Sequence, residues 1–421
     1  MLPACNAADD TPPNIVLIMA DDLGYGDIAC YGSEYIKTPA IDLLASEGMK
    51  FTDYHSNGPV CTPTRAALMT GKYQQKVGLE GVIYVKGESR KTGLDVSELT
   101  IANLFREAGY STGIMGKWHL GYKKEYNPFN HGYDEFYGYV SGNIDYHSHY
   151  DNAGIYDWWH NLDTIVEEGY STDLITEHSI DFIRNNRDKH FFLYIPHEAP
   201  HVPFQGRKDT GCRIPGRTFS YLGPVEDQQA AYKEMVEVMD EGIGQIMQTL
   251  RELNLDQNTI VFFCSDNGAR FGSNGELRGD KGSVWEGGHR VPAIAWYPDF
   301  IEAGSTTDEG VISMDLVPTL LTMAGIETSA SFDGIDFSSV MLRQSPLKER
   351  PLFWRYHGQL AVRKGNWKYL SINNEEYLFN LQADLAEENN QIDQNTEITK
   401  EMKTLLTNWE NEMEAYKQKT K

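Results

Sequence analysis

Asn14-Ile15-Val16-Leu17-Ile18-Met19-Ala20 is a continuous apolar run that leads directly into Asp21-Asp22. Such a run, without polar alternation, is typical of a β-strand buried on both faces of a parallel sheet. Two aspartates alone usually mark a solvated turn, but at the end of a buried strand they are costly unless a cation neutralises them. The stretch therefore predicts an α/β fold and points to the end of this strand as a candidate site.

Strands of the same kind recur along the chain and alternate with helical patterns. We expect buried strands at 112–115, 190–195, 259–264 and 291–296, and helices at 41–49, 99–108, 172–185, 230–253 and 314–323. This alternation predicts a large, mostly parallel, doubly wound sheet flanked by helices. Between 122 and 170 the sequence has the character of a long aromatic binding loop.

The character of the sequence changes beyond about residue 345. Four short segments with tight turns between them predict a small antiparallel sheet, and a helical pattern follows at 398–416. We therefore expect a catalytic α/β domain at 14–344 and a smaller C-terminal α+β subdomain at 345–421.

A second polar pair, Asp266-Asn267, follows the expected strand at 259–264. Functional crevices in open α/β sheets lie at the carboxyl ends of the strands, so this pair should meet Asp21 and Asp22 there. Four oxygen donors, three of them anionic, suit a hard cation better than zinc or copper.

The motif Cys61-Thr62-Pro63-Thr64-Arg65 opens a predicted helix that ends at Gly71. A cysteine at the mouth of a helix meets free backbone N–H groups that attract an anion, and Arg65 follows one turn later on the same face. A lone Cys-x-x-x-Arg is more often a buried thiol beside a surface arginine. The pattern therefore needs support from elsewhere in the chain.

That support comes from a resemblance. C-T-P-T-R-x-x-L-x-T-G resembles the signature of type I sulfatases of the alkaline-phosphatase-like superfamily, in which this cysteine is oxidised to Cα-formylglycine. Gly-Lys-Trp-His-Leu-Gly at 116–121, His-x-Pro at 201–203 and a lysine ahead of Glu-Gly-Gly-x-Arg-Val-Pro follow in the family's order. The resemblance covers about 14–390, and Asp280 departs from the glycine more usual before that lysine.

The resemblance implies the site residues, one by one. The implied catalytic residues are Cys61, Arg65, Lys117, His119, His201 and Lys281, and the implied metal ligands are Asp21, Asp22, Asp266 and Asn267. His197 competes with His201 for the role of general acid. The implied metal is calcium, with magnesium the weaker candidate, because an all-side-chain oxygen set must also admit a sulfate oxygen.

The implied mechanism is covalent catalysis. One hydroxyl of the hydrated formylglycine, deprotonated by Asp266, attacks sulfur in line while Arg65, Lys117 and Lys281 hold the sulfate oxygens. His201 protonates the leaving alcohol, and His119 then takes a proton so that the aldehyde reforms and sulfate leaves. A formylglycine-generating or sulfatase-maturating enzyme is therefore an expected partner.

The substrate is predicted from the segment 141–149. Asn143, His147 and His149 offer hydrogen-bonding groups, with Trp158 and Trp159 nearby, and this mixture suits sugar rings. An ordinary surface loop is the competing interpretation. The segment resembles that of bacterial polysaccharide sulfatases, so a sulfated carbohydrate is the preferred substrate. Two other functions stay open: a phosphatase or phosphonate monoester hydrolase, and a catalytically silent glycan-binding relative.

Composition limits the partners and the location. A net charge of −24 argues against nucleic-acid binding, and no stretch has the length and apolarity of a transmembrane segment. Leu2-Pro3-Ala4-Cys5 is similar to the end of a bacterial lipoprotein cleavage site, or arises by chance, and the opening lacks the other parts of a signal peptide. We expect a periplasmic, cell-surface or secreted bacterial protein. Five cysteines leave disulfide pairing open.

Overall fold

The computed structural model describes residues 11–215, 217, 219–343 and 345–419. Strand β1 (Asn14–Ala20) lies at the centre of a ten-stranded sheet, and each of its residues is buried, as its apolar sequence predicts. The lipoprotein-like stretch at 2–5 lies outside the described residues. The sheet order is β11 (Ser305–Thr307), β2 (Met49–Phe51), β10 (Ala293–Trp296), β9 (Thr259–Ser265), β1, β8 (Phe191–Pro196), β4 (Ser111–Lys117), β5 (Glu135–Tyr139), β6 (Trp159–His160) and β7 (Asp163–Thr164).

The middle of this sheet is parallel and its flanks are mixed. β1 pairs in parallel with β8 and β9, and β4 pairs in parallel with β8 and β5. β10 is antiparallel to both β9 and β2, and β6 is antiparallel to β5 and β7. The prediction of a mostly parallel sheet is therefore confirmed, with antiparallel strands added toward the edges.

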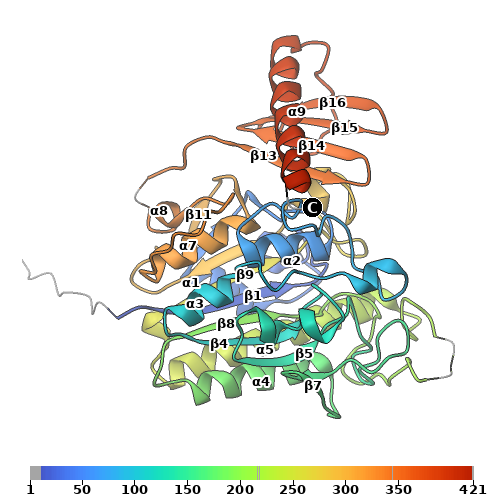
Figure 1. The fold of residues 1–421 in the computed structure, drawn as a ribbon, viewed down its shortest axis with the longest axis vertical. Coiled ribbons are helices and arrows are strands. Elements are labelled where there is room, and N and C mark those ends of the chain that lie inside the picture. Colours follow the sequence, from blue (N-terminus) through green and yellow to red (C-terminus); the bar gives the residue numbers. More distant parts are fainter. Residues whose placement is uncertain (1–10, 216, 218, 344, 420–421) are drawn as a thin grey trace, which may run out of the picture.

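Helices cover both faces of the sheet (Figure 1). α1 (Pro39–Glu47), α4 (Ser171–Asn185) and α5 (Gln228–Glu252) pack with Val16 and Ile18 of β1 in one apolar core. α2 (Cys61–Thr70), α3 (Ile101–Glu107) and α7 (Leu316–Met323) pack with Ile15 and Leu17 in the other. Successive strand residues face opposite sides, so an apolar run without alternation fills both cores.

The segment 122–170 differs from the predicted loop. It contains β5, which extends the sheet beside β4, and the short hairpin of β6 and β7. β5 has the sequence Glu-Phe-Tyr-Gly-Tyr, and Gly138 within it lies opposite Gly116 of β4. A short strand with an internal glycine carries little apolar signal, so the pattern alone did not indicate it.

The C-terminal region forms a separate four-stranded antiparallel sheet with a long helix across it (Figure 1). Its elements are β13 (Pro351–Tyr356), β14 (Gln359–Lys364), β15 (Trp367–Ile372), β16 (Glu375–Asn380) and α9 (Thr396–Lys419). Phe353 and Trp409 stack at 5.1 Å between the sheet and α9. The same core includes Ala67 of α2 and Met314, so the small sheet is packed against the helix that begins at Cys61. The domain boundary at 344/345 stays a prediction.

Short elements complete the described chain. They are η1 (Ala29–Tyr31), β3 (Tyr54–His55), η2 (Glu88–Lys91), η3 (Lys124–Tyr126), η4 (Pro128–His131), η5 (Asp256–Asn258), α6 (Glu286–His289), β12 (Val311–Ile312), η6 (Ser313–Asp315) and α8 (Ser338–Met341). Among the described helices, none has the length and apolarity needed to cross a membrane. Cys30, Cys61, Cys212 and Cys264 carry free thiols.

Candidate active site

The four expected metal ligands lie together because β1 and β9 are parallel neighbours. Ala20 pairs with Ser265 at the last position of the register, so both polar pairs leave the sheet at the same edge. The Asp22 amide donates to Asp266 Oδ1 at 3.2 Å, and Asn267 Nδ2 donates to Asp22 Oδ1 at 2.7 Å. All four side chains are buried.

Three cationic side chains surround this group of carboxylates. Lys117, the last residue of β4, places Nζ 2.5 Å from Asp21 Oδ2. Arg65 donates to Asp266 Oδ2 through Nε at 3.1 Å and through Nη2 at 2.8 Å. Lys281 Nζ lies 2.6 Å from Asp22 Oδ1 and holds the pKa of that carboxyl well below its usual range, against the effect of burial. These ion pairs offset the free-energy cost of removing so many charged groups from water.

The donor set fits a hard divalent cation. Asp21 Oδ1 and Asn267 Oδ1 are buried and have no hydrogen-bond partner within the described residues. Burial, reinforced by the charge of Asp266, raises the pKa of Asp21 to about 8. Oxygen atoms that are grouped to bind a cation lack hydrogen-bond partners when the cation is absent, and their crowding raises a carboxyl pKa. Both features are present here. Asp21, Asp22, Asp266 and Asn267 are therefore the residues that would hold the metal.

Cys61 is the first residue of α2 and lines the pocket above this cluster. The extended conformation of Val60 precedes it, and Thr64 Oγ1 fixes the entering loop by donating to Gly58 O at 2.9 Å. Burial raises the pKa of the Cys61 thiol. An unmodified thiol here is therefore poorly ionised and a weak nucleophile, despite the nearby lysines.

His119 lies in the same pocket in a strained backbone conformation. Its φ is 55°, in the left-handed region, and Asp22 is similar at 65°. His119 Nε2 lies 2.9 Å from Ile83 O, whereas Nδ1 is buried without a partner in the described structure. A Cβ on Gly142 would lie 2.7 Å from His119 Cε1, so only glycine leaves room for this ring. Strain of this kind is concentrated at functional sites.

The two candidate acids, His197 and His201, have different surroundings. His201 lines the pocket, with Nε2 3.7 Å from Asp22 Oδ2 and Nδ1 2.8 Å from Val202 O. His197 is fully buried outside the pocket, and burial lowers its pKa to about 3. The geometry therefore favours His201 over His197 as the residue that meets a leaving group.

The pocket has a volume of about 640 Å³, within the range of about 300–1,000 Å³ that ligand sites occupy. Its lining combines the cations Lys86, Arg270 and Lys281 with histidines and tyrosines, and contains no carboxylate among the described residues. In a chain with a net charge of −24, this is a local field that attracts anions. The lining residues that the sequence did not single out include Tyr84, Lys86, Tyr122, Tyr221, Arg270, Tyr356 and His357.

Of the three predicted substrate contacts, the structure brings only Asn143 into the pocket. Arg213, a buried residue that the sequence analysis missed, donates to Asn143 Oδ1 at 2.6 Å and fixes the amide. His147 pairs with Gly206 O at 3.0 Å, and His149 is buried against Trp158 with ring centroids 4.8 Å apart. His147 and His149 therefore do not line the pocket, and their contacts hold the loop together.

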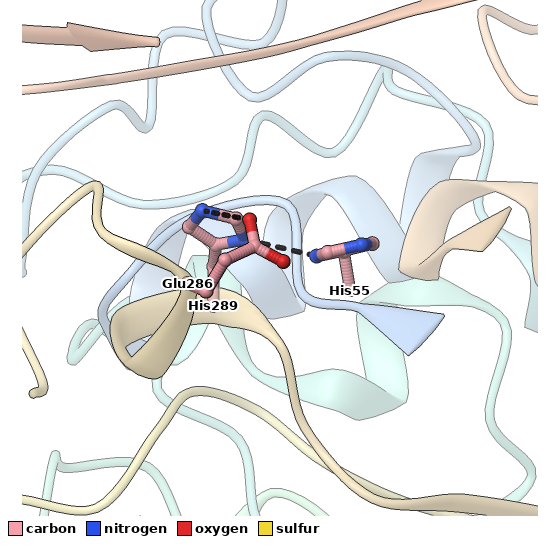
Figure 2. A group of neighbouring side chains, drawn as sticks. All are labelled: His55, Glu286 and His289. Atoms are coloured by element: carbon pink, nitrogen blue, oxygen red, sulfur yellow. Dashed lines mark hydrogen bonds and ion pairs between the residues drawn. The ribbon is translucent and has the colours of Figure 1, made fainter. Parts of the chain in front are cut away.

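A second cluster of titratable groups, His55, Glu286 and His289, lies outside the pocket lining, and Figure 2 shows these side chains close to one another. His55 Nδ1 lies 3.0 Å from His289 Nδ1, and Glu286 lies beside them. Lys368 Nζ lies 2.8 Å from Glu286 Oε1 and 3.2 Å from His289 Nε2, and Arg363 Nη1 lies 3.0 Å from His55 Nε2. These cations occupy the positions a metal would need, so the cluster is a structural charge network.

Comparison with known proteins agrees with this geometry. The model of the sulfatase family matches residues 13–326, and that of the N-sulphoglucosamine sulphohydrolase C-terminal region matches 275–412. N-acetylgalactosamine-6-sulfatase of Sus scrofa is 35% identical over 392 residues, covering 85% of this chain and 71% of that relative. Arylsulfatase of Hemicentrotus pulcherrimus is 33% identical, covering 85% and 67%.

A solved structure extends the match to the whole fold. The crystal structure of Ps i-CgsB in complex with k-i-k-neocarrahexaose has a TM-score of 0.86 and 30% identity, covering 95% of this chain and 93% of that one. The chain therefore belongs to the sulfatase family, whose members are sulfuric ester hydrolases.

Proposed function

We propose that this sulfatase hydrolyses sulfate esters of a carbohydrate. The observation that carries the proposal is the pocket itself, where Cys61 lies among three cations, several tyrosines and the amide of Asn143, with no carboxylate in its described lining. Cations suit the sulfate, aromatic faces and amides suit a sugar ring, and the volume admits more than the sulfate group. The names of the relatives, an N-acetylgalactosamine-6-sulfatase and a protein bound to a neocarrahexaose, support the same class.

The nucleophile in this proposal is the hydrated formylglycine made from Cys61. The weak acidity of the buried thiol supports an oxygen nucleophile over a thiolate. Asp266 would take the proton from the attacking hydroxyl. Arg65 already donates hydrogen bonds from both Nε and Nη2 to Asp266. Its proposed role is therefore to orient that carboxylate and not to bind sulfate directly.

Lys117 and Lys281 are the proposed sulfate contacts. Their ammonium groups pair with Asp21 and Asp22. A calcium ion on the oxygen ligands would neutralise those carboxylates and withdraw electron density from the reacting oxygens. Lys117 and Lys281 could then turn to the negative charge that develops on the sulfate.

His201 is the proposed general acid, and His119 the proposed base for release of sulfate. Burial and Lys281 hold the pKa of His201 well below its usual range. The negative charge of a bound sulfate ester opposes both effects and would raise the pKa of His201. Substrate binding would therefore favour the protonated form of His201, which is the form that acts as the acid. The unpartnered Nδ1 of His119 is free to accept a proton at the end of the cycle.

Maturation and location belong to the same proposal. Conversion of Cys61 requires a formylglycine-generating or sulfatase-maturating enzyme. Because Cys61 is buried at the start of a packed helix, that enzyme would act on the chain before α2 has docked. A periplasmic, cell-surface or secreted location in a bacterium fits a large polymeric substrate.

The test compares release of inorganic sulfate from 4-nitrophenyl sulfate and N-acetylgalactosamine 6-sulfate with release of phosphate from 4-nitrophenyl phosphate. Sulfate release from both esters, lost in Cys61→Ala, is the expected result. Preferential phosphate release would assign the pocket to a phosphatase. Binding of sulfated sugars without release of either anion would indicate a silent glycan-binding protein.

A further inference from the structure

Two of the three cations that line the pocket are not used by the proposed reaction. Lys281 is half-buried at the reacting end and paired with Asp22. Arg270 and Lys86 are exposed at the pocket, and neither has a carboxylate within 4.0 Å among the residues described. A single sulfate ester leaves both of them without a function.

Arg270 is held in place by backbone and not by a counter-ion. Its Nη2 donates to Lys281 O at 3.2 Å, which anchors the guanidinium on the backbone of the proposed sulfate contact. A guanidinium has five N–H donors in a planar fork. The other donors of Arg270 have no partner in the described structure, so the fork is available to a planar or tetrahedral oxyanion.

The wall beside Arg270 comes from the C-terminal sheet. Gly282 lies between the two: a Cβ at this position would lie 3.6 Å from Arg270 Nη2 and 3.9 Å from Tyr356 Cε1. Tyr356 ends β13, and His357 follows it in the turn to β14. A sugar ring that extended past Lys281 would therefore meet an aromatic side chain and a guanidinium together.

Arg270 and Lys86 contrast with the strongly negative net charge of the whole molecule. With 61 acidic against 37 basic residues, the surface repels a polyanionic substrate. Cations without counter-ions inside a cleft counter this locally and act over the Debye length of about 8 Å at physiological salt. A substrate with an uncharged second sugar would gain nothing from them.

We propose that Arg270, assisted by Lys86, forms a second anion site for a sulfate ester or carboxylate on the sugar next to the one that carries the scissile sulfate. This inference rests on the proposed carbohydrate substrate. It narrows that class to glycans with at least one further anionic group per disaccharide. Arg270 would hold the anion by charge-assisted hydrogen bonds, and Lys86 would add a point charge.

Binding is measured by calorimetry in the Cys61→Ala chain, which cannot form the nucleophile. The probes are three disaccharides of N-acetylgalactosamine 6-sulfate, whose second sugar is neutral, sulfated or a uronic acid. We expect one or both charged probes to bind more tightly than the neutral probe, and the sulfated and uronic arms identify which anion the site prefers. Arg270→Ala should reduce that preference roughly tenfold to a hundredfold, the range for losing charged hydrogen bonds.

Three variants make the experiment specific. Arg270→Lys keeps the charge without the fork and should retain part of the preference, and Lys86→Ala should reduce it less than Arg270→Ala does. Arg106→Ala removes an exposed arginine of α3 that lies outside the pocket, so it changes the net charge by the same amount and should leave the preference unchanged.

Equal affinity for the three disaccharides, or no binding of any, would overturn the second site. So would a preference that survives Arg270→Ala or that Arg106→Ala reduces equally, because it would then reflect net charge. Turnover by the mature enzyme is followed separately. Absence of sulfate release from any ester would defeat the proposed function, while the affinities would still decide on Arg270.

Discussion

Two histidines near this site, His197 and His201, differ in their surroundings. His197 and His201 are four residues apart and both buried, yet only His201 reaches the pocket that holds Cys61. His201 keeps Nε2 toward Asp22 and the pocket, whereas both ring nitrogens of His197 lack partners in the described structure. Their positions therefore favour His201 over His197 as the residue that protonates the leaving group.

Replacing each histidine by alanine separates their roles. A sugar hydroxyl leaves poorly without a proton, whereas nitrophenolate leaves well, so loss of a general acid is felt mainly on the sugar. His201→Ala should lose on the order of a hundredfold or more in kcat on N-acetylgalactosamine 6-sulfate, and much less on 4-nitrophenyl sulfate. His197→Ala should affect both substrates to a similar extent.

The two variants are compared at one pH, with the formylglycine content of each measured by mass spectrometry. If His197→Ala shows the stronger dependence on the leaving group, the acid is at 197. If neither variant distinguishes the two esters, proton donation by either histidine is excluded as the important step.

The strand-end residues could be predicted because their position follows from a simple pattern. Asp21, Asp22, Asp266 and Asn267 each come directly after an apolar strand, and parallel neighbours end at one edge. Arg270 and Tyr356 gave no such signal, because they come from a loop and from the end of β13, and the approach of these two segments to each other depends on tertiary packing. The position of His149 against Trp158 could not be predicted, since a polar, aromatic segment has the same composition whether it binds sugar or packs inward.

Among the elements, α6 (Glu286–His289) has a special place because it follows the Lys281 loop and contacts the C-terminal sheet. Lys368 of β15 lies 2.8 Å from Glu286 Oε1 and 2.9 Å from Glu387 Oε1, with all three side chains fully buried. Burial raises the pKa of Glu387 to about 7 even beside this lysine. The sequence predicted these strands, but not the charges that join them to the active-site loop.

Lys368→Met should remove the only cation that contacts both carboxylates among the described residues. Breaking a buried ion pair by removing one partner typically costs about 3–5 kcal/mol, because the remaining charge is left in a poor environment. Urea unfolding followed by circular dichroism should show a loss of this order. Sulfate release should fall as well, since α6 anchors the loop of Lys281.

Lys364→Met is the matched control, a half-buried lysine on the neighbouring strand β14 that pairs with the exposed Glu401 at 2.7 Å. It should leave the unfolding midpoint nearly unchanged, because surface pairs contribute little. Adding Glu387→Gln to Lys368→Met should recover part of the loss by removing one orphaned charge. Equal effects of the two lysine variants would contradict the structural importance of this network.

At the scale of the whole molecule, the fold brings three carboxylates together at the ends of two strands, beside Lys117, Arg65 and Lys281. In the ion-free protein burial raises the pKa of Asp21 to about 8, so a proton competes with a metal for this carboxyl group at neutral pH. A metal must displace that proton. Metal affinity should therefore be highest above about pH 8 and fall by up to tenfold per unit as the pH decreases below it.

Removal of the metal by a chelator should abolish sulfate release and lower the melting temperature. Because a ligand stabilises the folded state by mass action, calcium at a hundred times its Kd should add about 2.7 kcal/mol to the free energy of unfolding. Calorimetry with calcium, magnesium and zinc at pH 6, 7 and 8 checks both the identity of the metal and the sign of the pH dependence. Restoration by zinc and not by calcium would contradict the assignment of a hard cation.

The most direct test of the whole account concerns residue 61. The chain is produced with and without a sulfatase-maturating enzyme, and each preparation is weighed by intact mass spectrometry and assayed for sulfate release from 4-nitrophenyl sulfate. Conversion of Cys61 to formylglycine removes about 18 Da. We predict that the rate rises in proportion to the fraction of chain with this lower mass and extrapolates to zero for unmodified protein, and turnover at the full rate by chain that retains the Cys61 thiol would contradict it.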